Sequence, residues 1–209
     1  VPHFSKHSMQ LASCTQPLPH DGHVPRAHGH SCIEGDCTTP QFRTLQVVDQ
    51  GWHGSFLDGQ LEHNPGNTAL ATGHINLRVD GGQAIGFVAG FMVFDLTEQL
   101  GSIVEASIRV NGRLSGESED DNETLVLYDV STTIETLRAA GSPAEVIDDL
   151  RSGTELGTVT VAPSNGNAIL AIELNEAGLT VINAADGQVA LGLYMTTAAE
   201  TENIYYEVR

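Results

Sequence analysis

From residue 45 onward, short apolar runs with a period of two residues alternate with polar turns, and this feature constrains the fold more than any other. In residues 74–80, Ile75, Leu77 and Val79 alternate with polar side chains, which is the pattern of a strand with one buried face. Many such runs at short spacing predict an all-β domain over residues 45–209, a β-sandwich or jelly-roll-like fold.

The run 84–96 is apolar almost throughout, which predicts a strand buried on both faces and bent at Gly90. The alternation in 102–114 changes phase, which indicates a β-bulge. The predicted strands are 45–49, 74–80, 84–96, 102–114, 124–130, 155–162, 167–174, 188–196 and 203–209. We expect the two sheets to bury Ile75, Leu77, Val79, Val88, Phe91, Val93, Ile108, Leu125, Leu127, Val159, Ile172 and Leu191 between them.

Two or three short helices are predicted in the connections. Thr132 and Glu135 have the spacing of a capping box. Ser142 is predicted to cap a second helix, and the face that this helix turns to the core is Val146, Ile147 and Leu150. A third helix is predicted over residues 175–185, with Asn175 as its cap.

Residues 1–44 differ from the rest of the chain and are predicted to form an extended N-terminal arm. They contain five prolines, which exclude a continuous helix, and they lack long apolar runs. Residues 4–11 and 42–48 are short pieces that can form strands. Such a piece can add to the sheet of a neighbouring molecule, or the arm can fold back on its own domain or stay disordered.

The formal net charge of −18, with a single lysine, excludes two classes of partner. An acidic surface repels nucleic-acid phosphates and anionic lipids. No apolar stretch approaches the roughly 20 residues of a membrane-spanning helix. The chain begins with Val1, which fits a processed, secreted protein. We therefore expect an extracellular or cell-surface location, where acidity also favours solubility.

Two alternatives remain for the cysteines and histidines of the arm. His28, His30, Cys32 and Cys37 lie within ten residues, and imidazole and thiolate are the ligands that copper and zinc prefer. In an oxidising compartment, the other outcome is a disulfide among Cys14, Cys32 and Cys37, with the odd cysteine left for a partner chain or a metal.

Two further features suggest ligands. The acidic loop 116–123 contains five carboxylates and is a candidate calcium site, although a solvated loop is the plainer interpretation. Trp52 lies in a Gly-Trp-His-Gly segment and could stack on a sugar ring, although packing at a sheet edge is the expected role. The sequence has no nucleophile elbow, phosphate-binding loop or zinc-protease motif, so we expect no catalytic residues and no enzyme activity.

Residues 45–209 resemble domains of bacterial exosortase-sorted (PEP-CTERM-type) surface proteins. The resemblance rests on the order of SIVEASIRV, ETLVLYDVSTTIETL, DDLRSGTELGTVTV and AIELNEAGLTVINAADGQVALG, preceded by DQGWHGSF and GFMVFDLT. It implies a cell-surface β-sandwich associated with biofilm matrix, without an active site to carry over. The chain ends without the family's hydrophobic sorting tail, and its arm is not part of the pattern.

Three functions therefore follow as hypotheses. The first is a structural or adhesive surface protein that binds itself or other matrix components, as a fibre subunit that adds strands through its arm. The second is an extracellular copper- or zinc-binding protein that uses the arm. The third is a carbohydrate-binding module, which an aromatic content of only 5% disfavours.

Overall fold

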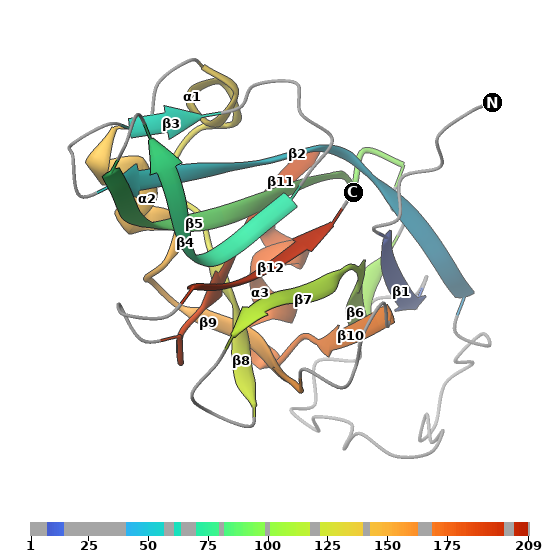
Figure 1. The fold of residues 1–209 in the computed structure, drawn as a ribbon. Coiled ribbons are helices and arrows are strands. Elements are labelled where there is room, and N and C mark those ends of the chain that lie inside the picture. The colour runs from blue at the N-terminus through green and yellow to red at the C-terminus, as the bar shows by residue number, and fades with distance from the viewer. Residues whose placement is uncertain are drawn as a thin grey trace, which may run out of the picture.

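The structure is a computed structural model. It describes residues 8–14, 41–56, 61–63, 70–79, 82–98, 101–117, 122–139, 143–162, 169–198 and 203–208. Figure 1 shows a mostly β fold, an antiparallel sheet nearly closed into a barrel, with three short helices. The strands are β1 (Ser8–Cys14), β2 (Gln41–Phe56), β3 (Leu61–His63), β4 (Leu70–Val79), β5 (Gly82–Asp95), β6 (Ser102–Asn111), β7 (Arg113–Glu117), β8 (Glu123–Asp129), β9 (Glu155–Val161), β10 (Ile169–Glu173), β11 (Gln188–Met195) and β12 (Asn203–Val208).

The sheet follows the order β10-β6-β1-β2-β5-β11-β8-β9, and its two end strands meet at one end. There the backbone N–H of Asn175 donates to the carbonyl of Leu156 (2.8 Å). The Asn175 side chain donates to the carbonyl of Glu155 (2.8 Å). Gly157 permits this approach, because a Cβ atom there would lie 2.4 Å from the carbonyl oxygen of Glu173. The barrel is thus closed at this end of the β9–β10 seam.

The long strand β2 forms a corner of the barrel. It pairs with β1 through residues 41–46 and with β5 through residues 47–56. Val48 has no partner in β5, so the register changes between Val47 and Asp49. A bulge of this kind bends a strand and exchanges which alternate side chains face inward. One strand therefore belongs to both parts of the sheet.

Strand β5 forks the sheet near Gly90. One edge of β5 pairs with β2, and the other pairs with β4 as far as Val88 and with β11 from Gly90 onward. A Cβ atom at Gly90 would lie 3.0 Å from the carbonyl oxygen of Ala71 and 2.5 Å from Leu70 Cδ1, so glycine favours the close approach of β4 here. The Met195 N–H of β11 donates to Thr72 Oγ1 of β4 across the fork (3.0 Å). The bend predicted at Gly90 is thus the branch point of the sheet.

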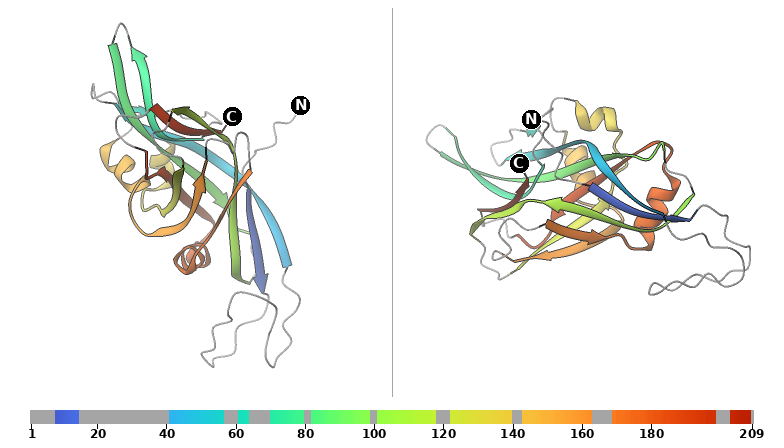
Figure 2. Two further views of the ribbon diagram at one scale, coloured as in Figure 1. Left: turned by 60° about the horizontal axis from the view of Figure 1, so that its bottom comes forward. Right: turned by 90° about the vertical axis from the view of Figure 1, so that its right-hand side faces the viewer.

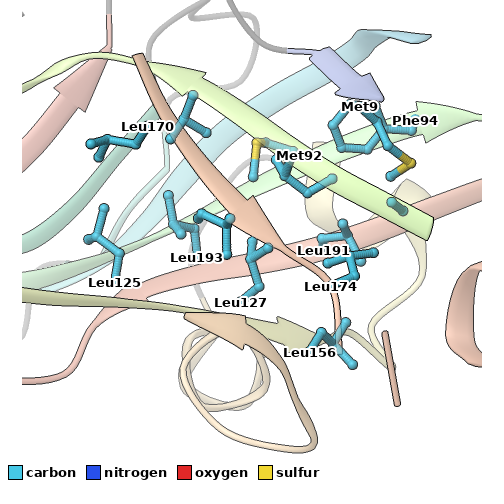
Figure 3. Close-up of a cluster of buried hydrophobic side chains, with 14 of the residues drawn as sticks. Met9, Met92, Phe94, Leu125, Leu127, Leu156, Leu170, Leu174, Leu191 and Leu193 are labelled. Atoms are coloured by element: carbon cyan, nitrogen blue, oxygen red, sulfur yellow. The ribbon is translucent and has the colours of Figure 1, made fainter. Parts of the chain in front are cut away.

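The predicted core is confirmed at the positions that the structure describes. Figure 3 shows part of the main cluster of buried side chains inside the barrel. Ile108, Leu125, Leu127, Ile172 and Leu191 are buried in this main cluster, and Val159 is partly buried against it. Val88, Phe91 and Val93 are also buried, but not between two sheets: Phe91 and Val93 lie in the cluster that α1 and α2 cover, and Val88 packs with Ala71 and Trp52. The side chains of Ile75, Leu77 and Val79 lie outside the described residues.

Helix α1 (Ile134–Arg138) and helix α2 (Ala144–Leu150) cover the outer side of β5 and β11. The predicted α1 cap was one residue early, because Thr133, not Thr132, accepts the hydrogen bond from Thr136 N. Pro143 is the N-cap residue of α2 and makes no side-chain cap, and Ser142 lies outside the described residues. The apolar face of α2 is confirmed, since Val146, Ile147 and Leu150 are buried.

Helix α3 (Glu176–Ala184) matches its prediction, and Asn175 caps it by accepting from Gly178 N. The predicted all-β class and short connecting helices are therefore confirmed. Two strands were not predicted as such, β1 and the short β3. The β-bulge predicted in 102–114 is confirmed at Val104 of β6, because Ala12 of β1 is opposite Glu105 and Ser13 is opposite Ile103. Gly112 separates β6 from β7.

Candidate functional site

A strand from the predicted arm lies in the middle of the sheet. Figure 2 shows β1 between β2 and β6. Met9 is opposite Leu45 of β2 and Ile108 of β6, and Leu11 is opposite Arg43 and Ala106. Both edges of β1 are therefore hydrogen-bonded. We call the space between β2 and β6 that this strand fills the β1 slot.

The side chains of β1 complete the main core. Met9 is 0% exposed and Leu11 is 1% exposed, and both belong to the main buried cluster. Figure 3 shows Met9 as it enters this cluster from β1. Gln10, between them, is exposed. Ser13, the next residue on the same side as Leu11, is buried too, and the small Ala12 between them is 3% exposed. The slot thus selects a short strand with apolar side chains at alternate positions.

The connection between β1 and β2 is much longer than their pairing requires. Ser13 is opposite Gln41, so the two strand ends are adjacent. An antiparallel pair of this kind needs only about two to five residues to connect. The chain provides residues 15–40 instead. At up to ~3.3 Å per extended residue, a segment of that length far exceeds what is needed to join two adjacent strand ends.

The two walls of the slot are held differently. On one side, β6 pairs with β10 along its other edge, and Asn183 of α3 accepts from the Ile103 N–H and donates to its carbonyl, both at 2.8 Å. On the other side, β2 pairs with β5 only through residues 47–56, so residues 41–46, which line the slot, have β1 as their strand partner. Arg43 of β2 donates to the carbonyl of Glu98 (2.9 Å). The β6 wall is therefore held without β1, whereas the β2 wall depends on β1 for its strand pairing.

The predicted metal and disulfide residues are not placed by this fold. His28, His30, Cys32 and Cys37 lie outside the described residues. The backbone of Cys14 ends β1, directly opposite Ser102 of β6. Within the described part of the chain, no group of three or more histidine, cysteine or acidic side chains is arranged to hold a metal ion.

The structure places only part of the other two candidate ligand sites. Trp52 is half-buried and packs against Ala71 and Val88, which is the packing role expected for it. Glu123, at the end of the acidic loop, is buried and accepts from Thr197 Oγ1 (2.5 Å). The central loop residues 118–121 lie outside the described residues.

Several polar residues without a predicted role fasten α1 to the sheet. His53 is fully buried, its Nε2 lies 3.0 Å from the Leu137 carbonyl, and its ring packs on Phe91. Arg138 of α1 forms an ion pair with Asp49 of β2. The sequence feature that indicates this role for His53 is its position in a strand. It directly follows Trp52, so the two side chains face opposite sides of the sheet.

Asp149 of α2 fixes the segment that precedes α1. Its carboxylate accepts from Ser131 N (3.0 Å), Ser131 Oγ (2.7 Å) and Thr132 N (2.7 Å). Partial burial opposes ionisation of Asp149, but the hydrogen bonds outweigh it, so its pKa is lowered from the usual value. Arg151, just after α2, places its guanidinium 4.5 Å from the centre of the Phe87 ring. The helical cover is therefore held by several specific contacts.

In comparisons with known proteins, no family model and no curated protein matches this sequence. The functional argument therefore rests on the residues and contacts of the fold. Among the described residues, no helix has the length and apolar character needed to cross a membrane. The β1 slot is the feature of the fold that offers a specific binding mode.

Proposed function

We propose that this chain is a secreted structural or adhesive surface protein that assembles by exchanging β1 between subunits. The observation that supports the proposal is the central position of β1 together with the length of residues 15–40. A strand donated by a neighbour would make the same hydrogen bonds and bury the same Met9 and Leu11 side chains. Exchange therefore needs no new contact, which is why swapping is a low-cost route to oligomers.

The geometry of exchange determines the form of the assembly. Each subunit has one donor strand and one slot, so repeated exchange joins subunits head to tail. A head-to-tail contact that does not close into a ring produces a filament. A reciprocal exchange between two subunits produces a closed dimer instead. We favour the filament, because residues 15–40 can span different subunit arrangements without a fixed two-fold axis.

Three other observations agree with this proposal. The net charge of −18 suits an extracellular surface and disfavours nucleic acid. The resemblance to exosortase-sorted surface domains points to matrix proteins. The corner strand β2, shared by two parts of the sheet, is compatible with the finer β-sandwich or jelly-roll-like assignment, which we retain as part of the proposal.

The proposal is tested by removing the donor strand. The chain lacking residues 1–14 is expected to stay as single subunits with an open slot, whereas the full chain assembles into species many times larger in sedimentation velocity. A peptide of residues 1–14 should bind the truncated chain one to one and restore its thermal stability. The matched control peptide carries Leu11→Asp and should not bind, because it would bury an unpaired charge.

Two results would contradict the proposal. One is a full-length chain that remains a single subunit at millimolar concentration after repeated partial unfolding and refolding. The other is a truncated chain that assembles as well as the full one, since the donor strand would then be unnecessary.

A further inference from the structure

Residues 41–46 of β2 depend on β1 for their place in the sheet. Each of them is directly opposite a residue of β1, from Ser13 at one end to Ser8 at the other. The pairing of β2 with β5 starts only at Val47, so among the described strands β1 is the one partner of this stretch. Strand β1 and residues 41–46 therefore form a two-stranded unit, which we call the β1–β2 hairpin.

The β1–β2 hairpin is attached to the rest of the barrel along one edge. Its strand β1 pairs with β6. Met9 and Leu11 are buried in the main cluster, and Leu45 packs against that cluster. Arg43 donates to the carbonyl of Glu98 (2.9 Å). Separating the whole hairpin from the barrel thus breaks one strand ladder, the one between β1 and β6.

Removal of β1 alone breaks two ladders, because β1 is paired on both of its edges. It also leaves residues 41–46 without a strand partner, so their backbone groups lose the hydrogen bonds of the sheet. Both movements withdraw Met9 and Leu11 from the core. Movement of the hairpin adds the loss of the partial packing of Leu45 and of the exposed Arg43 hydrogen bond. Release of the whole hairpin therefore breaks fewer backbone hydrogen bonds than release of β1 alone.

The bulge of β2 lies directly beside the hairpin. The register with β5 shifts between Val47 and Asp49, so Val48 has no partner in β5, and its side chain is 50% exposed. A bulge bends its strand, and a change of backbone angles at a few residues moves whatever lies beyond them as one piece. Straightening β2 at Val48 carries the hairpin away from its own β6, while residues 49–56 stay paired with β5.

We propose that the unit exchanged between subunits is the β1–β2 hairpin, which moves about a hinge at Val48. This inference rests on the strand exchange proposed above and names the part of the chain that moves. The hairpin of one subunit docks on β6 of its neighbour, where Met9 again lies opposite Ile108. The polypeptide then crosses between subunits at residues 47–49, while residues 15–40 join two strands that stay together.

Two cysteine pairs that share one position distinguish the hairpin from β1 alone. Gln10 is directly opposite Thr44 of β2 and Ser107 of β6, at backbone separations that suit a disulfide. None of these three side chains is buried, so the core is left intact. One chain carries Gln10→Cys with Thr44→Cys, and the other carries Gln10→Cys with Ser107→Cys. Both also carry three changes that remove competing thiols, Cys14→Ser, Cys32→Ser and Cys37→Ser.

Each chain assembles under reducing conditions, is diluted and oxidised, and is then analysed by non-reducing denaturing electrophoresis. If the hairpin is exchanged, the pair at positions 10 and 107 joins different chains and gives covalent multimers. The pair at positions 10 and 44 stays within one chain and runs at 22.2 kDa, because β1 and β2 move together. Gln10→Cys without a second cysteine is the matched control and should run as a single chain.

The two other outcomes separate this inference from the proposed function. Covalent multimers from both pairs would overturn the hairpin and leave exchange of β1 alone. Single chains from both pairs would overturn strand exchange itself, and the hairpin with it.

Discussion

The two outer faces of the barrel are covered in different ways. The outer side of β5 and β11 is covered by α1 and α2, and Leu137, Val146 and Leu150 bury a second apolar cluster there. The outer side of β10, β6, β1 and residues 41–46 of β2 carries Phe42, which is 73% exposed, whereas Asp49 further along β2 pairs with Arg138 of α1. The helical cover comes from one continuous segment, residues 134–150. The other side contains β1, a strand from the predicted arm, so that part of the fold depends on a segment distant in sequence from β6.

This difference predicts where a substitution affects assembly as well as stability. The largest effect is expected for Leu11→Ala in β1. It removes a fully buried side chain from the main core and should lower the free energy of unfolding of the single subunit by about 2–5 kcal/mol. Gln10→Ala, the matched change on the exposed side of the same strand, should change it by no more than about 0.5 kcal/mol. Urea unfolding measures both, and equal costs would mean that β1 is not packed as described.

A smaller and purely local effect is expected for Leu137→Ala in α1. Leu137 is fully buried, but its helix is short and lies at the surface of the barrel. We expect a loss of about 2 kcal/mol, at the lower end for a buried leucine, because the cover can relax. The proposed strand exchange should be unaffected, so sedimentation should give the same assembly as the unaltered chain. Loss of assembly would show that the two faces are coupled.

Asp149→Ala tests the hydrogen bonds that hold the cover, with an expected cost of about 1–2 kcal/mol. The pKa of Asp149 is lowered in the folded chain, so its ionised form contributes fully above the unfolded pKa, about 4. That contribution is lost as the pH falls through the folded pKa. The difference in stability between the two chains should therefore be constant near pH 7 and shrink below about pH 4. A difference that instead grows on acidification would contradict this assignment.

The smallest effect is expected for the ion pair between Arg138 and Asp49. The Arg138 side chain is 47% exposed, so solvent and salt screen the attraction. Arg138→Ala should cost less than about 1 kcal/mol, and the cost should fall further at high salt. Thermal unfolding at two ionic strengths measures it. A cost of several kcal/mol would mean that the pair is far less accessible to solvent than the structure indicates.

Sequence patterns predicted the parts of the fold that short-range signals control. Three of these signals are the alternation around Ile108, the continuous apolar run around Phe91 and the cap at Asn175. Each depends either on contacts between residues close in sequence or on which face of a single strand or helix is buried. The strand β1 has only Met9 and Leu11 as large buried residues, too few to stand out in a segment rich in proline and histidine. Its partners lie on β2 and β6, so the place of this strand in the sheet depends on long-range pairing.

The candidate site was therefore less predictable than the core. Strand addition by the arm was inferred from short strand-capable pieces, but the slot that receives β1 could not be located without the register of β2 and β6. The one-residue error at Thr132 has a similar origin. Two adjacent threonines offer the same side chain, and in the structure it is Thr133 that accepts from Thr136 N.

The central claim is that β1 of one subunit occupies the slot of another, and one measurement addresses it directly. Ser102→Cys, in a chain that also carries Cys32→Ser and Cys37→Ser, is allowed to assemble under reducing conditions and is then oxidised. If β1 is exchanged, the disulfide between positions 14 and 102 joins different chains, and non-reducing denaturing electrophoresis shows a ladder of covalent multimers. If β1 stays in its own slot, the assembled protein runs as a single 22.2 kDa chain, which would contradict the claim.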